Sequence, residues 1–297
     1  MILLPHSSAA ASVSLKSART FFVRCLLASH IGFSSPQETG SLKTDIPYAE
    51  VGGEKLLLDA HVPEGTGPFP VAILIHGGGW GSGSKEGDIT PLFKPLSSAG
   101  YVWFSINYRL APAHRWPACF DDVKSAIRWV KSHSAEYKGD PTRIALIGYS
   151  AGGHLACLAA ATSDDSTRVQ AVAALAAPTD HPADTARRGA LSPSLQALLD
   201  RPATVDAVTA GLLEEISPVH HLKRDLPPYL LIHGTEDKSV LFTQSGDFHT
   251  KLRELSIPCK FLPIQGAPHR LSEWETFDPD YQTTLIAWLN ATLGSGK

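Results

Sequence analysis

The chain has 297 residues, which is long enough to bury the core of one large domain. Hydrophobic residues make up 43% of it and charged residues 19%, a globular composition that excludes a disordered chain. The net charge is −3 and no long basic block occurs, which argues against a nucleic-acid partner.

Residues 1–42 differ from the rest of the chain. They are rich in Ser and Ala, have no acidic residue before Glu38, and contain the apolar run FFVRCLLASHIGF. Two interpretations stay open: a signal segment of a secreted or periplasmic protein, or a dispensable extension of a cytoplasmic one. No other segment approaches the roughly 18 apolar residues that a membrane-spanning helix needs, so we expect no stable membrane span.

From residue 43 to residue 297, segments typical of strands alternate with segments typical of helices, as in a single domain. Strands are expected at residues 44–50, 55–62, 71–75, 101–107, 143–147, 169–176, 229–232 and 260–264. Helices are expected at residues 121–132, 154–162, 244–255 and 279–293, with Asp121 as the N-cap of the first. Since most of the strands are continuous apolar runs, we expect an α/β fold with a mostly parallel central sheet flanked by helices.

Residues 180–225 interrupt this alternation. Helix-like pieces at 194–199 and 205–215 stand between prolines, and the segment is too long and too structured for a plain connection. We therefore expect a small helical cap inserted over the functional face of the domain.

The motif Gly148-x-Ser150-x-Gly152 joins an expected strand to an expected helix. In that context the motif is typical of a nucleophile elbow, a sharp turn that exposes a serine and needs small neighbours to close. The N-terminus of the following helix points at the site and favours a developing negative charge. Ser150 is thus the predicted nucleophile.

A second glycine-rich motif, HGGGW, begins at His76 directly after the strand expected at 71–75. Its glycines let backbone N–H groups approach a reacting oxygen closely, so we expect Gly78 and Gly79 to form an oxyanion hole with the N–H of Ala151. A phosphate-binding loop is not supported, because no Lys-Ser/Thr pair follows. His76 itself is interpreted as a structural, hydrogen-bonding histidine.

A nucleophilic serine needs a base and an acid. Where the serine stands on a nucleophile elbow, the acid follows it in the chain and the histidine comes after the acid. His269 lies in a loop after the strand expected at 260–264, and it is the predicted base. Asp237, in the HGTED turn after the strand at 229–232, is the predicted acid. Glu236 and Asp180 remain the alternatives for that role.

Several longer blocks resemble one family. HGGGW, NYRLAPAHRWPACFDDVKSAIRWV, DPTRIALIGYSAGGHLA and PPYLLIHGTEDKSV resemble the α/β-hydrolase superfamily, within it the carboxylesterase group that includes bacterial feruloyl/acetylxylan esterases and hormone-sensitive-lipase-like esterases. The resemblance implies the same triad of Ser150, Asp237 and His269. Two positions depart from the pattern: Leu241 replaces a frequent proline, and Arg270 follows the base where glycine is frequent.

These motifs predict a carboxylesterase, a serine enzyme that hydrolyses carboxylic esters through an acyl-enzyme intermediate. The resemblance suggests short acetyl-type or feruloyl esters of carbohydrates or small alcohols. An arylformamidase-like amide hydrolase is the alternative, and a non-catalytic binding protein is disfavoured because all three triad groups are present. Trp80, Tyr149 and Arg270 are the candidates for lining the substrate pocket.

The predicted mechanism needs no cofactor and no metal. The four cysteines, Cys25, Cys119, Cys157 and Cys259, form no CxxC pair, so neither a zinc site nor a redox motif is supported. Cys157 stands in an apolar run and is expected to be a small buried hydrophobe. The sequence leaves the disulfide pairing and the oligomeric state open.

Overall fold

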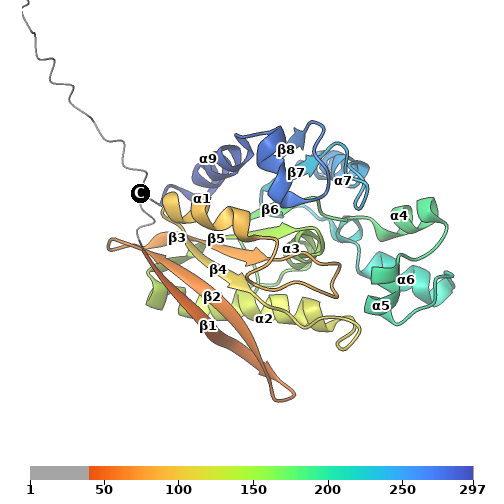
Figure 1. Cartoon of the computed structure of the whole chain (residues 1–297), viewed down its shortest axis with the longest axis horizontal. Helices are drawn as coiled ribbons and strands as arrows, with labels where there is room; N and C mark the ends of the chain where they lie inside the picture. The colour runs from red at the N-terminus through yellow and green to blue at the C-terminus, as the bar shows by residue number, and fades with distance from the viewer. Residues whose placement is uncertain (1–39, 297) are drawn as a thin grey trace, which may run out of the picture. The chain divides into compact units, whose positions relative to one another are not determined.

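The computed structural model describes residues 40–296 of the chain (Figure 1). Most of the segment expected to be a signal or an extension lies outside this range. Its last residues, from Gly40, already belong to the first strand of the sheet.

One eight-stranded sheet organises the described residues, and its strand order is β1-β2-β4-β3-β5-β6-β7-β8. The β1–β2 and β2–β4 pairs are antiparallel, and all later pairs are parallel. The predicted mostly parallel α/β fold is therefore confirmed. The strands are β1 (Gly40–Val51), β2 (Glu54–Pro63), β3 (Phe69–Ile75), β4 (Val102–Ile106), β5 (Gly139–Tyr149), β6 (Ala171–Leu175), β7 (Tyr229–Gly234) and β8 (Cys259–Ile264).

Helices cover both faces of the sheet (Figure 1). One face packs against α2 (Ala118–His133), α3 (Ala151–Ala161) and α7 (Thr243–Glu254). The other packs against α1 (Phe93–Ser98), α8 (Trp274–Phe277) and α9 (Tyr281–Leu293). The sequence does not predict α1 or α8, since six and four residues are too few to display a helical period.

The start of α2 corrects one prediction. The helix begins at Ala118, directly after Pro117, and no side chain caps it, so Asp121 is not its N-cap. The helix therefore starts three residues before the predicted position, and Pro117 is the residue that precedes it. Asp122 is buried and binds Arg109 through two carboxylate contacts of 2.7 and 2.9 Å.

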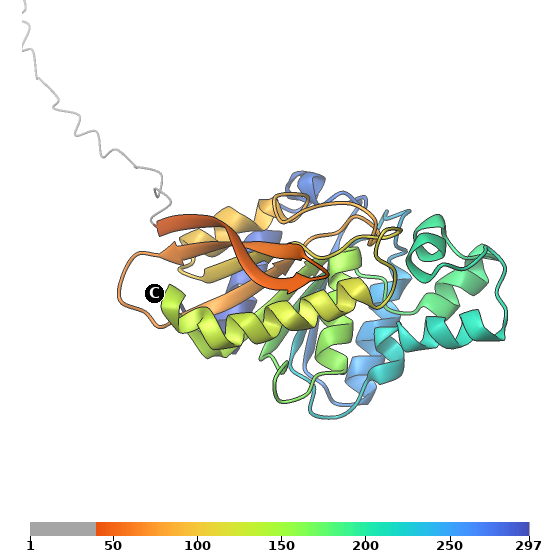
Figure 2. The same cartoon turned by 90° about the horizontal axis from the view of Figure 1, so that it is seen from below.

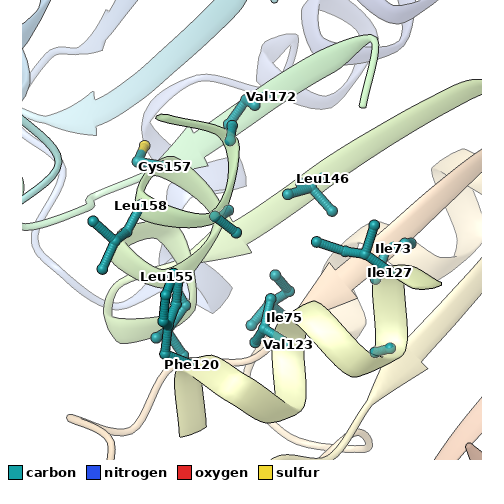
Figure 3. Packing of buried hydrophobic residues seen from close by; sticks show 14 of the residues in the cluster. Ile73, Ile75, Phe120, Val123, Ile127, Leu146, Leu155, Cys157, Leu158 and Val172 are labelled. Atoms are coloured by element: carbon teal, nitrogen blue, oxygen red, sulfur yellow. The ribbon is translucent and has the colours of Figure 1, made fainter. Parts of the chain in front are cut away.

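Aliphatic side chains fill the layer between the sheet and helices α2 and α3 (Figure 3). Each is almost fully removed from solvent, and burying such a side chain stabilises the fold by about 1.5–3 kcal/mol. Cys157 belongs to this layer, as expected. The labelled members include Ile73, Ile75, Val123, Ile127, Leu146, Leu155, Leu158 and Val172.

Three short helices stand between β6 and β7: α4 (His181–Arg188), α5 (Pro193–Leu199) and α6 (Ala207–Glu215). Each begins with a side chain that accepts a hydrogen bond from a first-turn N–H, namely Asp180, Ser192 and Asp206. Figures 1 and 2 both place the three helices together at one end of the sheet. We call α4, α5 and α6 the cap.

Two further findings concern the described residues only. Within residues 40–296, no helix is long and apolar enough to cross a membrane. Cys119, Cys157 and Cys259 are free thiols.

Candidate active site

Ser150 lies at the sharp turn between β5 and α3, with backbone angles φ 53° and ψ −119°. Few residues with side chains adopt such angles, and a strained serine of this kind is typical of a nucleophile elbow. Both neighbouring glycines are needed. A Cβ atom on Gly148 would lie 2.2 Å from the Gly152 carbonyl oxygen, and one on Gly152 would lie 2.1 Å from the Ile75 carbonyl oxygen.

The structure brings the three predicted triad residues into one hydrogen-bonded chain. The Oγ atom of Ser150 lies 3.0 Å from Nε2 of His269, and Nδ1 of His269 lies 2.6 Å from Oδ2 of Asp237. A carboxylate only accepts, so Nδ1 carries the proton and Nε2 accepts from the serine hydroxyl. Asp237 and His269 come from loops that follow β7 and β8, so adjacent parallel strands bring them together.

Four donors hold the Asp237 carboxylate. Besides His269, the backbone N–H groups of Ser239 and Val240 donate to Oδ1, and Nε2 of His233 lies 3.1 Å from Oδ2. Burial alone would raise the pKa of Asp237, but the hydrogen bonds from His233 and His269 hold that pKa well below its usual range. Asp237 is therefore a carboxylate at neutral pH.

The two alternative acids lie elsewhere. The side chain of Glu236 is exposed and pairs with Lys238 at 2.9 Å. Asp180 caps α4 by accepting from the N–H of Ala183 at 2.9 Å. Neither carboxylate is in contact with His269.

His233 is a neighbour of the triad that the sequence does not predict. It is fully buried, its Nε2 lies near two acceptors, Asp237 Oδ2 and the Val240 carbonyl oxygen, and its Nδ1 lies 2.7 Å from Ser245 Oγ. Nε2 therefore carries the proton, and Nδ1 accepts from the serine. The HG pair after a strand indicates a turn, and only the contact with Ser245 on α7 reveals this role.

The HGGGW loop folds over the same point. Gly78, Gly79 and Trp80 all have positive φ angles, of 97°, 58° and 59°. A Cβ atom on Gly78 would lie 2.1 Å from the carbonyl oxygen of Ser82, so the turn requires glycine there. Together with Ser150 and Ala151, these residues line one cavity, where the structure places the predicted oxyanion-hole residues around the nucleophile.

Side chains from other segments hold this loop. The hydroxyl of Tyr108 lies 3.0 Å from the carbonyl oxygens of both His76 and Gly77, and the Tyr108 ring stacks on that of His76. The N–H of Gly77 donates to Oδ1 of Asp88 at 2.9 Å. Since His76 is buried and its Nδ1 lies 2.8 Å from the Gly77 carbonyl oxygen, it contacts the loop rather than the triad.

His154 joins the loop to the cap. The indole N–H of Trp80 donates to Nδ1 of His154 at 3.2 Å, so Nε2 carries the proton and donates to the carbonyl oxygen of Ile216 at 2.6 Å. Complete burial lowers the pKa of His154 to about 4, which keeps the ring neutral. The sequence gives no signal for this contact, because Trp80 and His154 are 74 positions apart.

The cavity at the nucleophile has a volume of about 490 Å³ and extends from the HGGGW loop to the cap. Two of the three predicted pocket residues, Trp80 and Tyr149, line it, and the Tyr149 hydroxyl donates to the backbone carbonyl of His269 at 2.7 Å. Arg270 does not line it. Its exposed side chain pairs with Glu273 at 3.4 Å and borders a neighbouring cavity.

Within residues 40–296, no group of three or more His, Cys, Asp or Glu side chains is arranged to hold a metal ion. The arrangement at Ser150 can perform nucleophilic chemistry with the chain's own residues. A histidine can accept the serine proton, a carboxylate orients that histidine, and Gly78, Gly79 and Ala151 line the cavity beside the serine.

Known proteins are similar to this chain in sequence and in fold. The model of the BD-FAE family matches residues 58–252. The probable carboxylic ester hydrolase LipM of Mycobacterium tuberculosis is 38% identical over 226 residues, which cover 71% of this chain and 52% of LipM. This chain thus spans about half the length of the curated relatives it matches.

Two solved structures are also similar. A truncated carbohydrate esterase from gut microbiota has a TM-score of 0.74 at 23% identity, over 87% of this chain and 98% of that one. The acetyl ester-xyloside bifunctional hydrolase of Caldicellulosiruptor lactoaceticus has a TM-score of 0.71 at 25% identity, over 85% and 96%. The likeness to the gut-microbiota esterase, at 23% identity, concerns the fold alone.

The family match runs from β2 to α7 and includes the HGGGW loop, Ser150 and Asp237, whereas His269 lies beyond it and depends on the geometry. The resemblance seen in the sequence motifs is confirmed: the chain belongs to the BD-FAE family of α/β-hydrolase esterases.

Proposed function

We propose that this protein is a serine carboxylic-ester hydrolase that acts through an acyl-enzyme intermediate. The chain of hydrogen bonds from Ser150 through His269 to Asp237, at an elbow with a positive φ angle, supports this proposal above all. The curated relative LipM is named a probable carboxylic ester hydrolase, which agrees with that chemistry.

The first half of the reaction forms the acyl-enzyme. Nε2 of His269 takes the hydroxyl proton of Ser150 as Oγ attacks the ester carbonyl, and the N–H groups of Gly78, Gly79 and Ala151 stabilise the oxyanion. The tetrahedral intermediate then collapses. The bond to the alcohol oxygen breaks, and His269 gives its proton to the leaving alcohol.

The second half restores the enzyme. His269 takes a proton from water as the water oxygen attacks the acyl carbonyl, and the acid leaves while Oγ of Ser150 regains its proton. Asp237 stays ionised and stabilises the charged imidazole in both halves, because its pKa lies far below neutral pH.

We further propose short acyl groups, acetyl above all, on carbohydrates or small alcohols. The indole of Trp80, held by His154, and the buried ring of His181 fix one wall of the cavity beside the oxyanion loop. The acetyl ester-xyloside hydrolase among the structural neighbours agrees with such a substrate.

Replacing Ser150 by alanine tests the reaction. We expect p-nitrophenyl acetate hydrolysis to fall to background while far-UV circular dichroism stays unchanged, because the nucleophile alone is lost. Ser132→Ala, an exposed serine on α2, is the matched control and should keep full activity. Full turnover by Ser150→Ala would exclude Ser150 as the nucleophile.

A substrate panel tests the substrate class. The wild-type protein should hydrolyse p-nitrophenyl acetate and acetylated xylan faster than methyl ferulate, and N-formylkynurenine slowest. Faster turnover of N-formylkynurenine than of every ester would replace the ester hydrolase by an amide hydrolase.

A further inference from the structure

A second cavity, of about 550 Å³, adjoins the one at Ser150. The two share Asp88, Tyr149, Ser239 and His269, but the second is not lined by Ser150 or by the predicted oxyanion donors. We call it the side chamber. It therefore lies on the His269 side of the reacting centre, away from the oxyanion hole.

The proposed reaction indicates which half of the ester substrate occupies the side chamber. The carbonyl oxygen of a bound ester must face Gly78, Gly79 and Ala151, whereas the alcohol oxygen must lie within reach of Nε2 of His269, which protonates it. The alcohol half of the ester thus extends past His269, and the side chamber is the cavity that receives it.

Most charged side chains around the side chamber neutralise one another. Glu236 pairs with Lys238 at 2.9 Å, and Arg270 pairs with Glu273 at 3.4 Å. The remaining charged lining residue, Asp88, has no ion-pair partner among residues 40–296. The charge left in the chamber is therefore one carboxylate, which disfavours an anionic alcohol and favours a hydrogen-bond donor.

Asp88 also lies close to the reacting centre. One oxygen, Oδ1, accepts from the N–H of Gly77. A Cβ atom placed on Gly77 would lie 2.6 Å from Oδ2 of Asp88, 3.0 Å from the Tyr149 ring and 3.2 Å from Cβ of Ser150, so these three side chains converge on one point. Burial raises the pKa of Tyr149, and the nearby Asp88 charge raises that pKa further.

We propose that Asp88 is a specificity-determining residue for the alcohol half of the substrate. Its Oδ2 atom accepts a hydrogen bond from a free hydroxyl beside the ester bond, while Oδ1 stays bound to Gly77. The side chamber thus selects partially acylated polyols, with a free hydroxyl next to the acylated one, over simple alkyl esters and over anionic alcohols. This inference rests on the proposed ester hydrolysis.

Two acetyl esters of the same carbon skeleton test the proposal: glycerol 1-acetate, which has free hydroxyls, and propyl acetate, which has none. The wild-type protein should show the higher kcat/KM for glycerol 1-acetate. In Asp88→Asn the amide oxygen still accepts from Gly77, but an NH₂ group replaces the second acceptor, so the ratio of the two kcat/KM values should fall about tenfold.

Asp165→Asn is the matched control, because it makes the same chemical change at an exposed carboxylate that lines neither cavity. Its kcat/KM ratio should equal that of the wild type. An unchanged ratio in Asp88→Asn, or a parallel fall for both esters, would overturn the role of Asp88 and reduce it to a support of the loop. A wild-type protein that hydrolyses neither ester would instead overturn the proposed function.

Discussion

Asp237 is the residue on which the geometry of the site depends most. Its Oδ2 atom is shared by His269 and His233, and its Oδ1 atom accepts from two backbone N–H groups. The carboxylate therefore cannot rotate without breaking several bonds. The imidazole of His269 is consequently held with Nδ1 protonated and Nε2 facing Ser150.

Asp237→Asn should lower kcat for p-nitrophenyl acetate by about 10⁴-fold, because the amide favours the wrong tautomer of His269. Asp180→Asn is the control: asparagine caps a helix as well as aspartate does, so activity and melting temperature should stay close to those of the wild type. Steady-state kinetics measures both variants. A larger loss for Asp180→Asn would transfer the acid role to Asp180.

Some of these residues can be predicted from the sequence and others cannot. Ser150, Asp237 and His269 stand in motifs that follow strands, so chain order and strand order make them the leading candidates, but they leave Glu236 and Asp180 as alternative acids until the contacts are seen. His154 and Asp88 stand in no such pattern. Their roles depend on contacts with Trp80 and Gly77, which only the folded chain brings within hydrogen-bond distance.

At the level of elements, the HGGGW loop is a backbone turn held by the segment that contains Tyr108 and Ala111. Tyr108 binds its carbonyl oxygens, and the N–H of Ala111 donates to the Trp80 carbonyl at 2.9 Å. Further along, the buried Lys85 pairs with Asp59 of β2 at 2.9 Å. The loop that carries the proposed oxyanion donors is thus fixed before a substrate arrives, as preorganised stabilisation requires.

Tyr108→Phe removes one support of this loop. We expect the free energy of unfolding to fall by about 1–3 kcal/mol, because buried carbonyl groups lose their donor, and kcat to fall about tenfold. Urea denaturation and ester kinetics measure the two effects.

Tyr137→Phe is the matched control, since no hydrogen bond of its hydroxyl occurs among residues 40–296. It should change both quantities little. A Tyr108→Phe variant with wild-type kcat would show that the loop keeps its shape without this hydroxyl.

Some of the elements can be predicted from sequence patterns and others cannot. The eight strands follow from apolar runs and their spacing, and all eight are present. The start of α2 does not follow, because no capping side chain marks it. The block NYRLAP is visible as a family motif, but its function as the support of a loop depends on three-dimensional contacts.

At the scale of the whole domain, a buried hydrogen bond joins α3 to the end of the cap: His154 donates to the carbonyl oxygen of Ile216, the residue that follows α6. Within the insertion, the N–H of His181 donates to Ser217 Oγ at 2.9 Å. Both histidines are fully buried, and burial lowers both pKa values, that of His154 to about 4. The folded domain therefore excludes the protonated form of two residues that charge readily once exposed.

The stability of the folded domain should consequently decrease as the pH falls. An unfolded histidine has a pKa near 6.5, so the unfolded chain binds more protons below that pH, and the free energy of unfolding falls as pH drops from about 6.5 toward 4. For His154 the loss reaches about 3 kcal/mol at pH 4, and His181 adds to it. Urea denaturation at several pH values measures the effect.

A His154→Gln variant, which cannot gain this charge, should lose less stability over the same pH range than the wild type. Equal losses in the two proteins would show that other groups cause the acid sensitivity. Either result is read from the difference between the two pH profiles, so a lower stability of the variant at neutral pH does not affect it.

Helix α3 has a further consequence for the dynamics of the protein. All eleven of its residues, Ala151–Ala161, are buried, and Ser150 immediately precedes it. Amide protons in such an element exchange with solvent only when large parts of the domain open. In a deuterium-exchange experiment the backbone behind the nucleophile should label among the last segments, and α6, with its exposed Val208, much earlier. The backbone that carries the reacting serine should therefore stay in place on a time scale on which α6 already exchanges.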